Sequence, residues 1–179
     1  ESSKIYWKAD TFDLLQVHNL VNYEEHIETL TNLKKKNIIK YIGVTTSHGS
    51  RHKKLEYIMN KYELDFIQLT YNIIDREAEK YLLPLAREKK IAVIANRPFQ
   101  GGSLFNHVKR KKLTSMALNL GLKSWADFFL KFIISHPTIT CAIPATSRKD
   151  HMKENMQALY GDIPNEEQRN RLIKEFIDI

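Results

Sequence analysis

Short apolar segments alternate with amphipathic segments along most of this 179-residue chain. The apolar segments span residues 12–17, 41–45, 66–70, 91–95 and 139–143. Apolar runs of this length that are bounded by polar residues predict strands, the first of them buried on both faces. The connections are too long for hairpins, so the alternation predicts right-handed parallel βαβ units and an α/β fold.

Amphipathic periodicity predicts helices in the connections. They span residues 23–36, 50–62, 78–89, 113–120, 148–159 and 164–179, with a further helix after Ser124 and the tail of one over residues 1–9. Ser124 can cap its helix while Asp127 bonds back from three residues on. Pro84 lies inside the 78–89 helix, where a proline costs ~3 kcal/mol, so it indicates a kink or a restart. Residues 99–112 are predicted to be irregular.

The chain, residues 1–179, is predicted to be one domain with a C-terminal helix in residues 162–179. Five βα units fit either an open doubly wound sheet or part of a barrel, and periodicity does not distinguish the two. No G-x-G-x-x-G sequence follows the first strand, which removes the best sequence signal for a dinucleotide-binding open sheet.

Composition narrows the class of protein. A hydrophobic content of 42% and a charged content of 27% are typical of a globular protein with a core. No apolar run approaches the ~18–20 residues of a membrane span, and the first residues lack the apolar stretch of a secretory leader. With a single cysteine, Cys141, these features predict a cytoplasmic protein without membrane partners. The net charge is +7, but aromatic residues do not interleave the basic runs, so no nucleic-acid partner is predicted.

Polar residues follow each predicted strand. Because parallel strands of a barrel end at one edge, and chemistry is found at that edge, these residues are the candidates for a site. His18 is the first of them along the chain. By itself, a histidine after an apolar strand is more often a core residue than a catalyst. The spacing of the other histidines suggests no metal site.

Five motifs stand in order along the chain: FDLLQVHN, KYIGVTT, FIQLTYN, ANRPFQGGSL and AIPATSRKDHMKEN. Together they resemble the aldo-keto reductase family, and within it bacterial members with an LQVHN strand. The likeness extends from about residue 1 to residue 159. The resemblance implies a (β/α)8 TIM barrel, of which this chain matches units four to eight. A complete barrel takes ~250 residues, so the chain resembles the C-terminal part of a reductase.

The resemblance implies that His18 is a catalytic residue that orients or polarises the substrate carbonyl. The family's other catalytic residues are an Asp, a Tyr and a Lys from the first three units, so the chain alone is expected to be inactive. SSKIYW, residues 2–7, resembles a strand that could carry the family's Lys at Lys4. The spacing to Asp13 instead favours the helix that precedes strand four.

The resemblance also implies a nicotinamide dinucleotide site. Thr45, Thr46 and Gln68 match positions that bind the carboxamide, and Asn96 stands where many members have an aromatic residue that stacks on the nicotinamide. The loop over the pyrophosphate matches Arg97, Pro98, Gly101, Gly102 and Leu104. The adenosine end matches Pro144, Ala145, Thr146, Ser147, Arg148, His151, Glu154 and Asn155.

Members that favour NADPH often have Lys and Arg at the positions of Ala145 and His151. Thr146, Ser147 and Arg148 could still hold a 2′-phosphate, so NADP is the predicted cofactor and NAD the alternative. The predicted function is reduction of aldehyde or ketone carbonyls of small molecules to alcohols. A non-catalytic nucleotide-binding regulatory module is the alternative. The uncovered edges of a five-stranded sheet also predict self-association.

Overall fold

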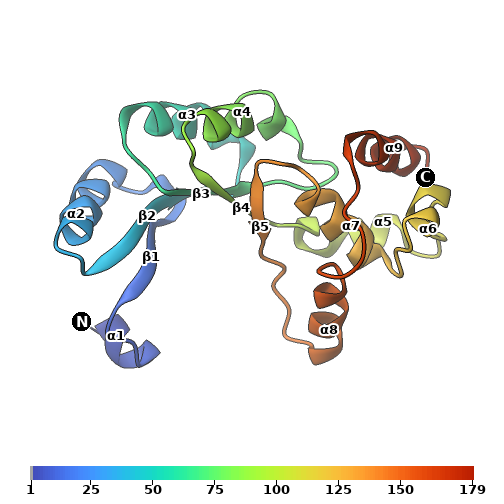
Figure 1. Ribbon diagram of the computed structural model, residues 1–179, viewed down its shortest axis with the longest axis horizontal. Helices are drawn as coiled ribbons and strands as arrows, with labels where there is room; N and C mark the ends of the chain where they lie inside the picture. The colour runs from blue at the N-terminus through green and yellow to red at the C-terminus, as the bar shows by residue number, and fades with distance from the viewer. Residues whose placement is uncertain (1) are drawn as a thin grey trace.

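A five-stranded parallel sheet forms the centre of the protein (Figure 1). The computed structural model describes residues 2–179, with side chains from residue 4 onward. The strands are β1 (Phe12–Val17), β2 (Ile39–Thr45), β3 (Phe66–Thr70), β4 (Ala92–Asn96) and β5 (Ile139–Ala142). They lie side by side in sequence order, and all are parallel. The predicted α/β fold and its strands are therefore confirmed, with strand ends that move by one or two residues.

One helix precedes β1, and helices follow each strand. They are α1 (Ser2–Trp7), α2 (Tyr23–Lys35), α3 (His52–Lys61), α4 (Leu82–Glu88), α5 (Ser103–His107), α6 (Ser115–Asn119), α7 (Trp125–Ile134), α8 (Lys149–Gln157) and α9 (Glu166–Ile177). Short 3-10 helices are η1 (His18–Leu20), η2 (Gly49–Arg51), η3 (Glu77–Glu79) and η4 (Gln100–Gly102). Figure 1 shows α2, α3 and α4 along one side of the sheet, while α5, α6, α7 and α9 gather beyond β5.

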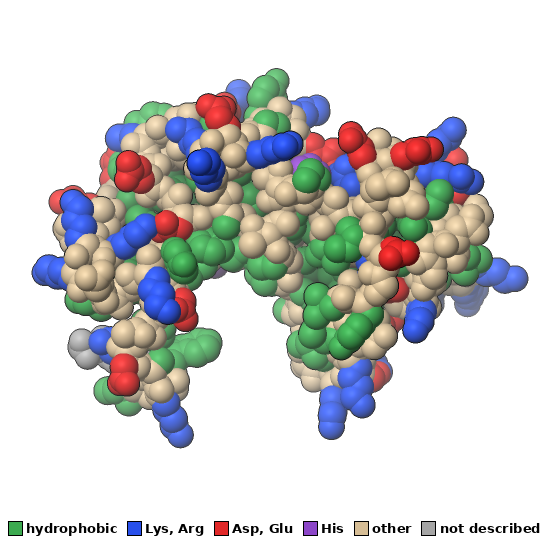
Figure 2. All heavy atoms as spheres, viewed as in Figure 1, with side chains coloured by type: hydrophobic (Ala, Val, Ile, Leu, Met, Phe, Trp, Pro, Cys, Tyr) green, Lys and Arg blue, Asp and Glu red, His purple; other side chains and the backbone are tan. Residues whose placement is uncertain are grey.

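The two faces of the sheet differ because side chains alternate along each strand. One row faces the helices, is in register across all five strands, and has no member more than 9% exposed. This row is Val17, Val44, Ile67, Val93 and Ile139. The opposite face is more open, and Figure 2 shows apolar side chains around the hollow beneath the sheet.

The prediction that the first strand is buried on both faces was wrong. Of β1, Val17 alone is buried; Asp13 is exposed and the other residues are half-buried. The physical reason is position, because β1 pairs with β2 on one side and forms an edge of the sheet. On the open face beside it, Tyr41 is 45% exposed and packs edge-on against Phe66, with ring centroids 5.6 Å apart.

Two predicted segments differ from the structure. The single helix over residues 78–89 is split into η3 and α4, and Pro84 lies in the first turn of α4. A proline costs little there, since the first N–H groups of a helix have no partner within it. Pro84 therefore marks the restart of the helix as α4, one of the two predicted alternatives.

The prediction of an irregular segment over residues 99–112 was wrong in part, because the segment contains η4 and α5. Gly101 and Gly102 there have positive φ angles of 65° and 94°, which permit the turn into α5.

The helix caps are set by local hydrogen bonds. Ser124 Oγ accepts from the backbone N–H of Asp127 at 3.2 Å, as predicted. Asp127 does not return the bond to Ser124; its carboxylate accepts from the N–H of Lys123 at 3.1 Å. The final helix begins at Glu166 and not at residue 164, because Asn165 caps it in a reciprocal pair with Gln168.

The N-terminal segment is helical. Lys4 lies in α1, as its spacing to the first strand favoured, and the alternative that placed Lys4 on a strand was wrong.

In the described part of the chain, no helix combines the length and the apolar character needed to cross a membrane.

Candidate cofactor site

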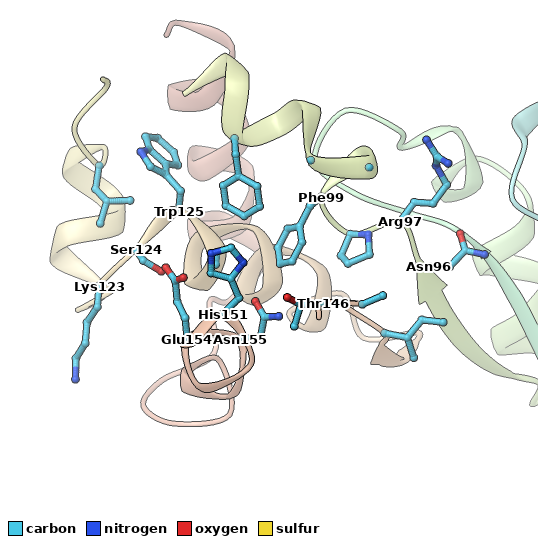
Figure 3. Close-up of a pocket in the computed structure, with 18 of the residues that line it drawn as sticks. Asn96, Arg97, Phe99, Lys123, Ser124, Trp125, Thr146, His151, Glu154 and Asn155 are labelled. Carbon is cyan, nitrogen blue, oxygen red and sulfur yellow. The ribbon is translucent and has the colours of Figure 1, made fainter. Parts of the chain in front are cut away.

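A cavity of about 1040 Å³ opens beyond the carboxyl ends of β4 and β5. One wall comes from the end of β4 and η4, and the other from the segment after β5 and from α8. Figure 3 shows the side chains of Phe99, Trp125 and His151 directed toward the same space, while Lys123 extends away from it. A volume of this size is sufficient for a ligand of dinucleotide or drug size.

The structure brings together more than half of the predicted cofactor residues. Those that line the cavity are Asn96, Arg97, Pro98, Gly101, Gly102, Ala145, Thr146, His151, Glu154 and Asn155. The remaining ones do not line it. Leu104 is fully buried in the core. Three of them neighbour lining residues in the sequence: Pro144, Ser147 and Arg148. The other three lie at or near the ends of β2 and β3: Thr45, Thr46 and Gln68.

Sequence motifs missed the aromatic side of the cavity. Phe99 and Phe105 line it with ring centroids 4.9 Å apart, and Trp125 closes the same side. The Trp125 indole N–H donates to the carbonyl of Lys111 at 3.1 Å, which ties the loop before α6 to the start of α7. Phe99 lies inside the ANRPFQGGSL motif, but Phe105 and Trp125 come from segments that only the fold brings together, so no spacing in the sequence identifies those two.

Hydrogen bonds connect the cavity to the neighbouring strand ends. The Asn96 amide donates from Nδ2 to the carbonyl of Thr46 at 2.9 Å and accepts at Oδ1 from the Thr70 hydroxyl at 2.9 Å. The backbone N–H of Thr46 donates to the carbonyl of Gln68 at 2.8 Å. The ends of β2, β3 and β4 thus form one hydrogen-bonded rim at the edge where barrel and open-sheet enzymes place their chemistry.

His18 lies at the same edge, beyond the end of β1. It is exposed, so the interpretation as a core histidine was wrong. Its Nδ1 is 3.4 Å from Thr45 Oγ1, and its Nε2 is 2.8 Å from Nδ2 of Asn19. The Thr45 hydroxyl oxygen also accepts the backbone N–H of Asn19 at 3.1 Å. The exposed ring is therefore held by residues of β2 and η1 and remains accessible from solvent.

The start of α8 forms the far end of the site. The N–H of Arg148 donates to Thr146 Oγ1 at 3.1 Å, and the Arg148 guanidinium forms an exposed ion pair with Asp150. The hydrogen bond from Arg148 lowers the pKa of Asp150 to about 2. The positive end of the helix favours an anion here, but the Asp150 carboxylate already accepts main-chain N–H groups of this turn and shares the Arg148 charge.

Among the described residues, no three His, Cys, Asp or Glu side chains are grouped so that they could hold a metal ion. The polar groups of the cavity include main-chain N–H groups beside glycines, the Arg97 guanidinium, the His151 imidazole, the Asn155 amide and the Glu154 carboxylate. The donors among these groups suit phosphate oxygens and hydroxyl groups.

The fold and the site define a parallel α/β protein with a large cavity at the carboxyl ends of its strands. The Aldo/keto reductase family matches residues 1–177 of the chain. The chain belongs to this family of oxidoreductases.

Relatives differ in how much of the chain they match. The chain is 26% identical over 174 residues to the uncharacterized oxidoreductase YqkF of Bacillus subtilis, covering 84% of the chain and 56% of that protein. It is 35% identical over 86 residues to the NADH-specific methylglyoxal reductase of Escherichia coli, covering 48% of the chain and 26% of that protein. The chain spans about half the length of the curated relatives it matches.

Solved structures confirm the fold. The holo form of the aldo-keto reductase AKR11C1 from Bacillus halodurans superposes with a TM-score of 0.77 at 21% identity. That match covers 98% of this chain and 64% of the other. At this identity the likeness shows the arrangement of strands and helices alone.

Proposed function

We propose that the chain forms units four to eight of an aldo-keto reductase barrel and holds its nicotinamide cofactor. The observation that carries this proposal is the cavity, because residues from two distant motifs, at the end of β4 and the start of α8, line it together. The reaction proposed is reduction of an aldehyde or ketone to an alcohol, with NADP as the cofactor and NAD as the alternative.

The residues of the cavity fit a dinucleotide. When bound, the nicotinamide supplies hydride chemistry. Gly101 and Gly102 leave the backbone open to close approach by a pyrophosphate, and the Arg97 guanidinium lies nearby, with its Nη2 3.8 Å from where a Cβ on Gly101 would stand. His151, Glu154 and Asn155 lie on α8 along the opposite wall, where they can bind the adenosine end. The positive end of the α8 dipole lies at Lys149, where it favours a phosphate.

At the strand ends, His18 is proposed to hydrogen-bond the substrate carbonyl. A proton donor must act with it, and the family resemblance assigns that role to residues of earlier units. A polypeptide of these 179 residues is therefore expected to bind nucleotide without turnover. The open face beside β1, where Tyr41 is 45% exposed, is proposed to be covered by further βα units or by a second copy of the chain.

The cavity is tested by nucleotide binding. Titration of the chain with NADPH should give energy transfer from Trp125, which lines the cavity, in a Trp7→Phe background. His151→Glu places a negative charge on the cavity wall and should weaken NADPH binding about tenfold, equivalent to about 1.4 kcal/mol.

The matched control is Lys153→Gln, which lowers the charge of α8 by one unit, as His151→Glu does, at a residue that does not line the cavity. Its effect should be smaller, because charge outside the cavity is screened by solvent and salt. Equal loss in both variants, or no binding by the wild-type chain, would refute the assignment of the cavity.

A further inference from the structure

Asn96 has both its amide nitrogen and its amide oxygen hydrogen-bonded to other parts of the protein. It is 8% exposed, its NH2 group faces the Thr46 carbonyl, and its oxygen receives the Thr70 hydroxyl. A carbonyl can only accept, so the orientation of the amide is fixed by its partners. The Thr70 hydroxyl also lies 3.1 Å from the carbonyl of Ser47, so its one proton is shared between that carbonyl and the Asn96 oxygen, which is nearer at 2.9 Å.

Gln68 differs from Asn96 in this respect. It is half-buried on the same face of β3 as Thr70, and its side chain has no hydrogen-bond partner in the described part of the chain. Its backbone carbonyl accepts from Thr46, whose own carbonyl is held by Asn96. A continuous path of hydrogen bonds therefore runs from the cavity wall through Thr46 to the backbone that carries the free Gln68 amide.

We propose that Asn96 is a positioning residue that holds the ends of β2 and β3 in register with the cavity, and that it does not bind the nicotinamide itself. This inference rests on the proposed function and changes one assignment within it. A nucleotide that reaches from α8 to Gln68 must lie along both the cavity wall and the end of β3. Asn96 lies where these two surfaces meet. An aromatic ring at position 96 could make neither hydrogen bond.

The experiment compares two probes on the wild-type chain and on two variants. NADPH spans both surfaces, whereas adenosine 2′,5′-bisphosphate needs the α8 end alone. Asn96→Leu removes both hydrogen bonds, and Asn96→Tyr adds a ring that could stack on a nicotinamide. Both variants should bind NADPH about tenfold more weakly, the effect of roughly one to two buried hydrogen bonds. Binding of adenosine 2′,5′-bisphosphate should change less than about twofold.

A stacking role for residue 96 would give the opposite result, since Asn96→Tyr would then bind NADPH as tightly as the wild type or more tightly. Equal loss of both probes would also overturn the inference, because it would indicate general damage. If the Asn96 variants do not fold, Thr70→Val removes one of the two bonds from the other partner and should show the same selective loss. If the wild-type chain binds neither probe, the proposed function fails, and the role of Asn96 is refuted with it.

Discussion

Two of the arginine–carboxylate pairs in the described part of the chain lie in contrasting surroundings. In one, Arg169 of α9 contacts Glu79 of η3 in the interior; in the other, Arg148 contacts Asp150 in solvent. The Arg169 side chain is 9% exposed, against 63% for Arg148. The same two functional groups join α9 to η3 in the buried pair and lie in solvent in the exposed pair.

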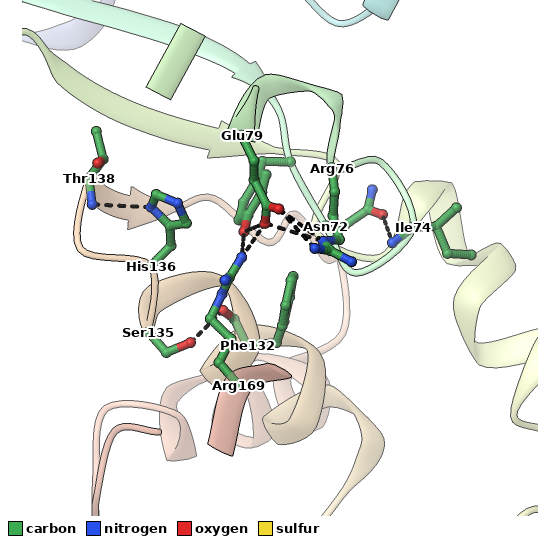
Figure 4. Close-up of polar contacts among 10 residues, drawn as sticks. Asn72, Ile74, Arg76, Glu79, Phe132, Ser135, His136, Thr138 and Arg169 are labelled. Carbon is green, nitrogen blue, oxygen red and sulfur yellow. Dashed lines mark hydrogen bonds and ion pairs between the residues drawn. The ribbon is translucent and has the colours of Figure 1, made fainter. Parts of the chain in front are cut away.

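The buried pair belongs to a larger cluster (Figure 4). The Tyr71 hydroxyl donates to Glu79 at 2.6 Å, Arg76 pairs with Glu79 at 2.9 Å, and the Arg169 guanidinium lies 4.8 Å from the centre of the Phe132 ring. Burial is the main cause that raises the pKa of Tyr71 above its ordinary value, so its hydroxyl stays a donor. The cluster fastens the C-terminal helix to the loop that follows β3.

This difference in burial determines how much each pair contributes to the stability of the fold. An exposed pair gains little, because water and salt screen it and both side chains lose freedom. Removing one member of a buried pair leaves a charge without compensation in the interior, which is costly. Mutations that remove one member of each pair should therefore separate a stabilising contact from a binding one.

The largest expected effect is on Arg169. Arg169→Leu should lower the free energy of unfolding by about 2 kcal/mol, because Glu79 loses a charge-assisted hydrogen bond while Arg76 and Tyr71 still bond it. Urea denaturation followed by circular dichroism measures the change. The control is Arg171→Leu on the same helix, where the arginine pairs with Glu175 at 3.3 Å and is 56% exposed. Similar losses in the two variants would show that burial does not distinguish these pairs.

A smaller loss of stability is expected when the pH is lowered. Burial opposes ionisation of Glu79, but hydrogen bonds from Arg76 and Tyr71 and the charge of Arg169 outweigh it, so its pKa lies below 4.5. Burial, and then the Arg169 charge, lower the pKa of His136 below 6.5. In both cases the unfolded chain takes up protons first, so stability is present at higher pH and is lost as pH falls through these ranges.

Unfolding midpoints measured from pH 7 downward test this dependence. His136→Gln should reduce the loss that begins near pH 6.5, and Glu79→Gln should reduce the loss below pH 4.5, although Glu79→Gln is less stable at neutral pH. A pH profile that is parallel in wild type and both variants would assign the acid sensitivity to other groups.

The sequence predicted local structure better than contacts between distant segments. Strand positions, the parallel arrangement and the capping role of Ser124 follow from local patterns, and the structure confirms them. The Arg169 cluster could not be predicted, because its members lie up to 98 residues apart and only tertiary packing joins them. The aromatic wall with Phe105 and Trp125 was missed for the same reason. Motif resemblance identified residues near the cavity, but it could not show that the Asn96 amide is already engaged.

The smallest effect on stability is expected at the exposed pair, where Asp150→Asn should leave the unfolding midpoint unchanged. Its effect should fall on ligands instead. Asp150 now shares the Arg148 charge and repels a phosphate at the start of α8, so its neutralisation should free the guanidinium for a 2′-phosphate. NADPH binding should tighten severalfold relative to NADH, measured by fluorescence titration of the same protein with both. An equal gain for NADH would mean that Arg148 does not contact the 2′-phosphate, and a fall in the unfolding midpoint would mean that this pair, like the buried one, stabilises the fold.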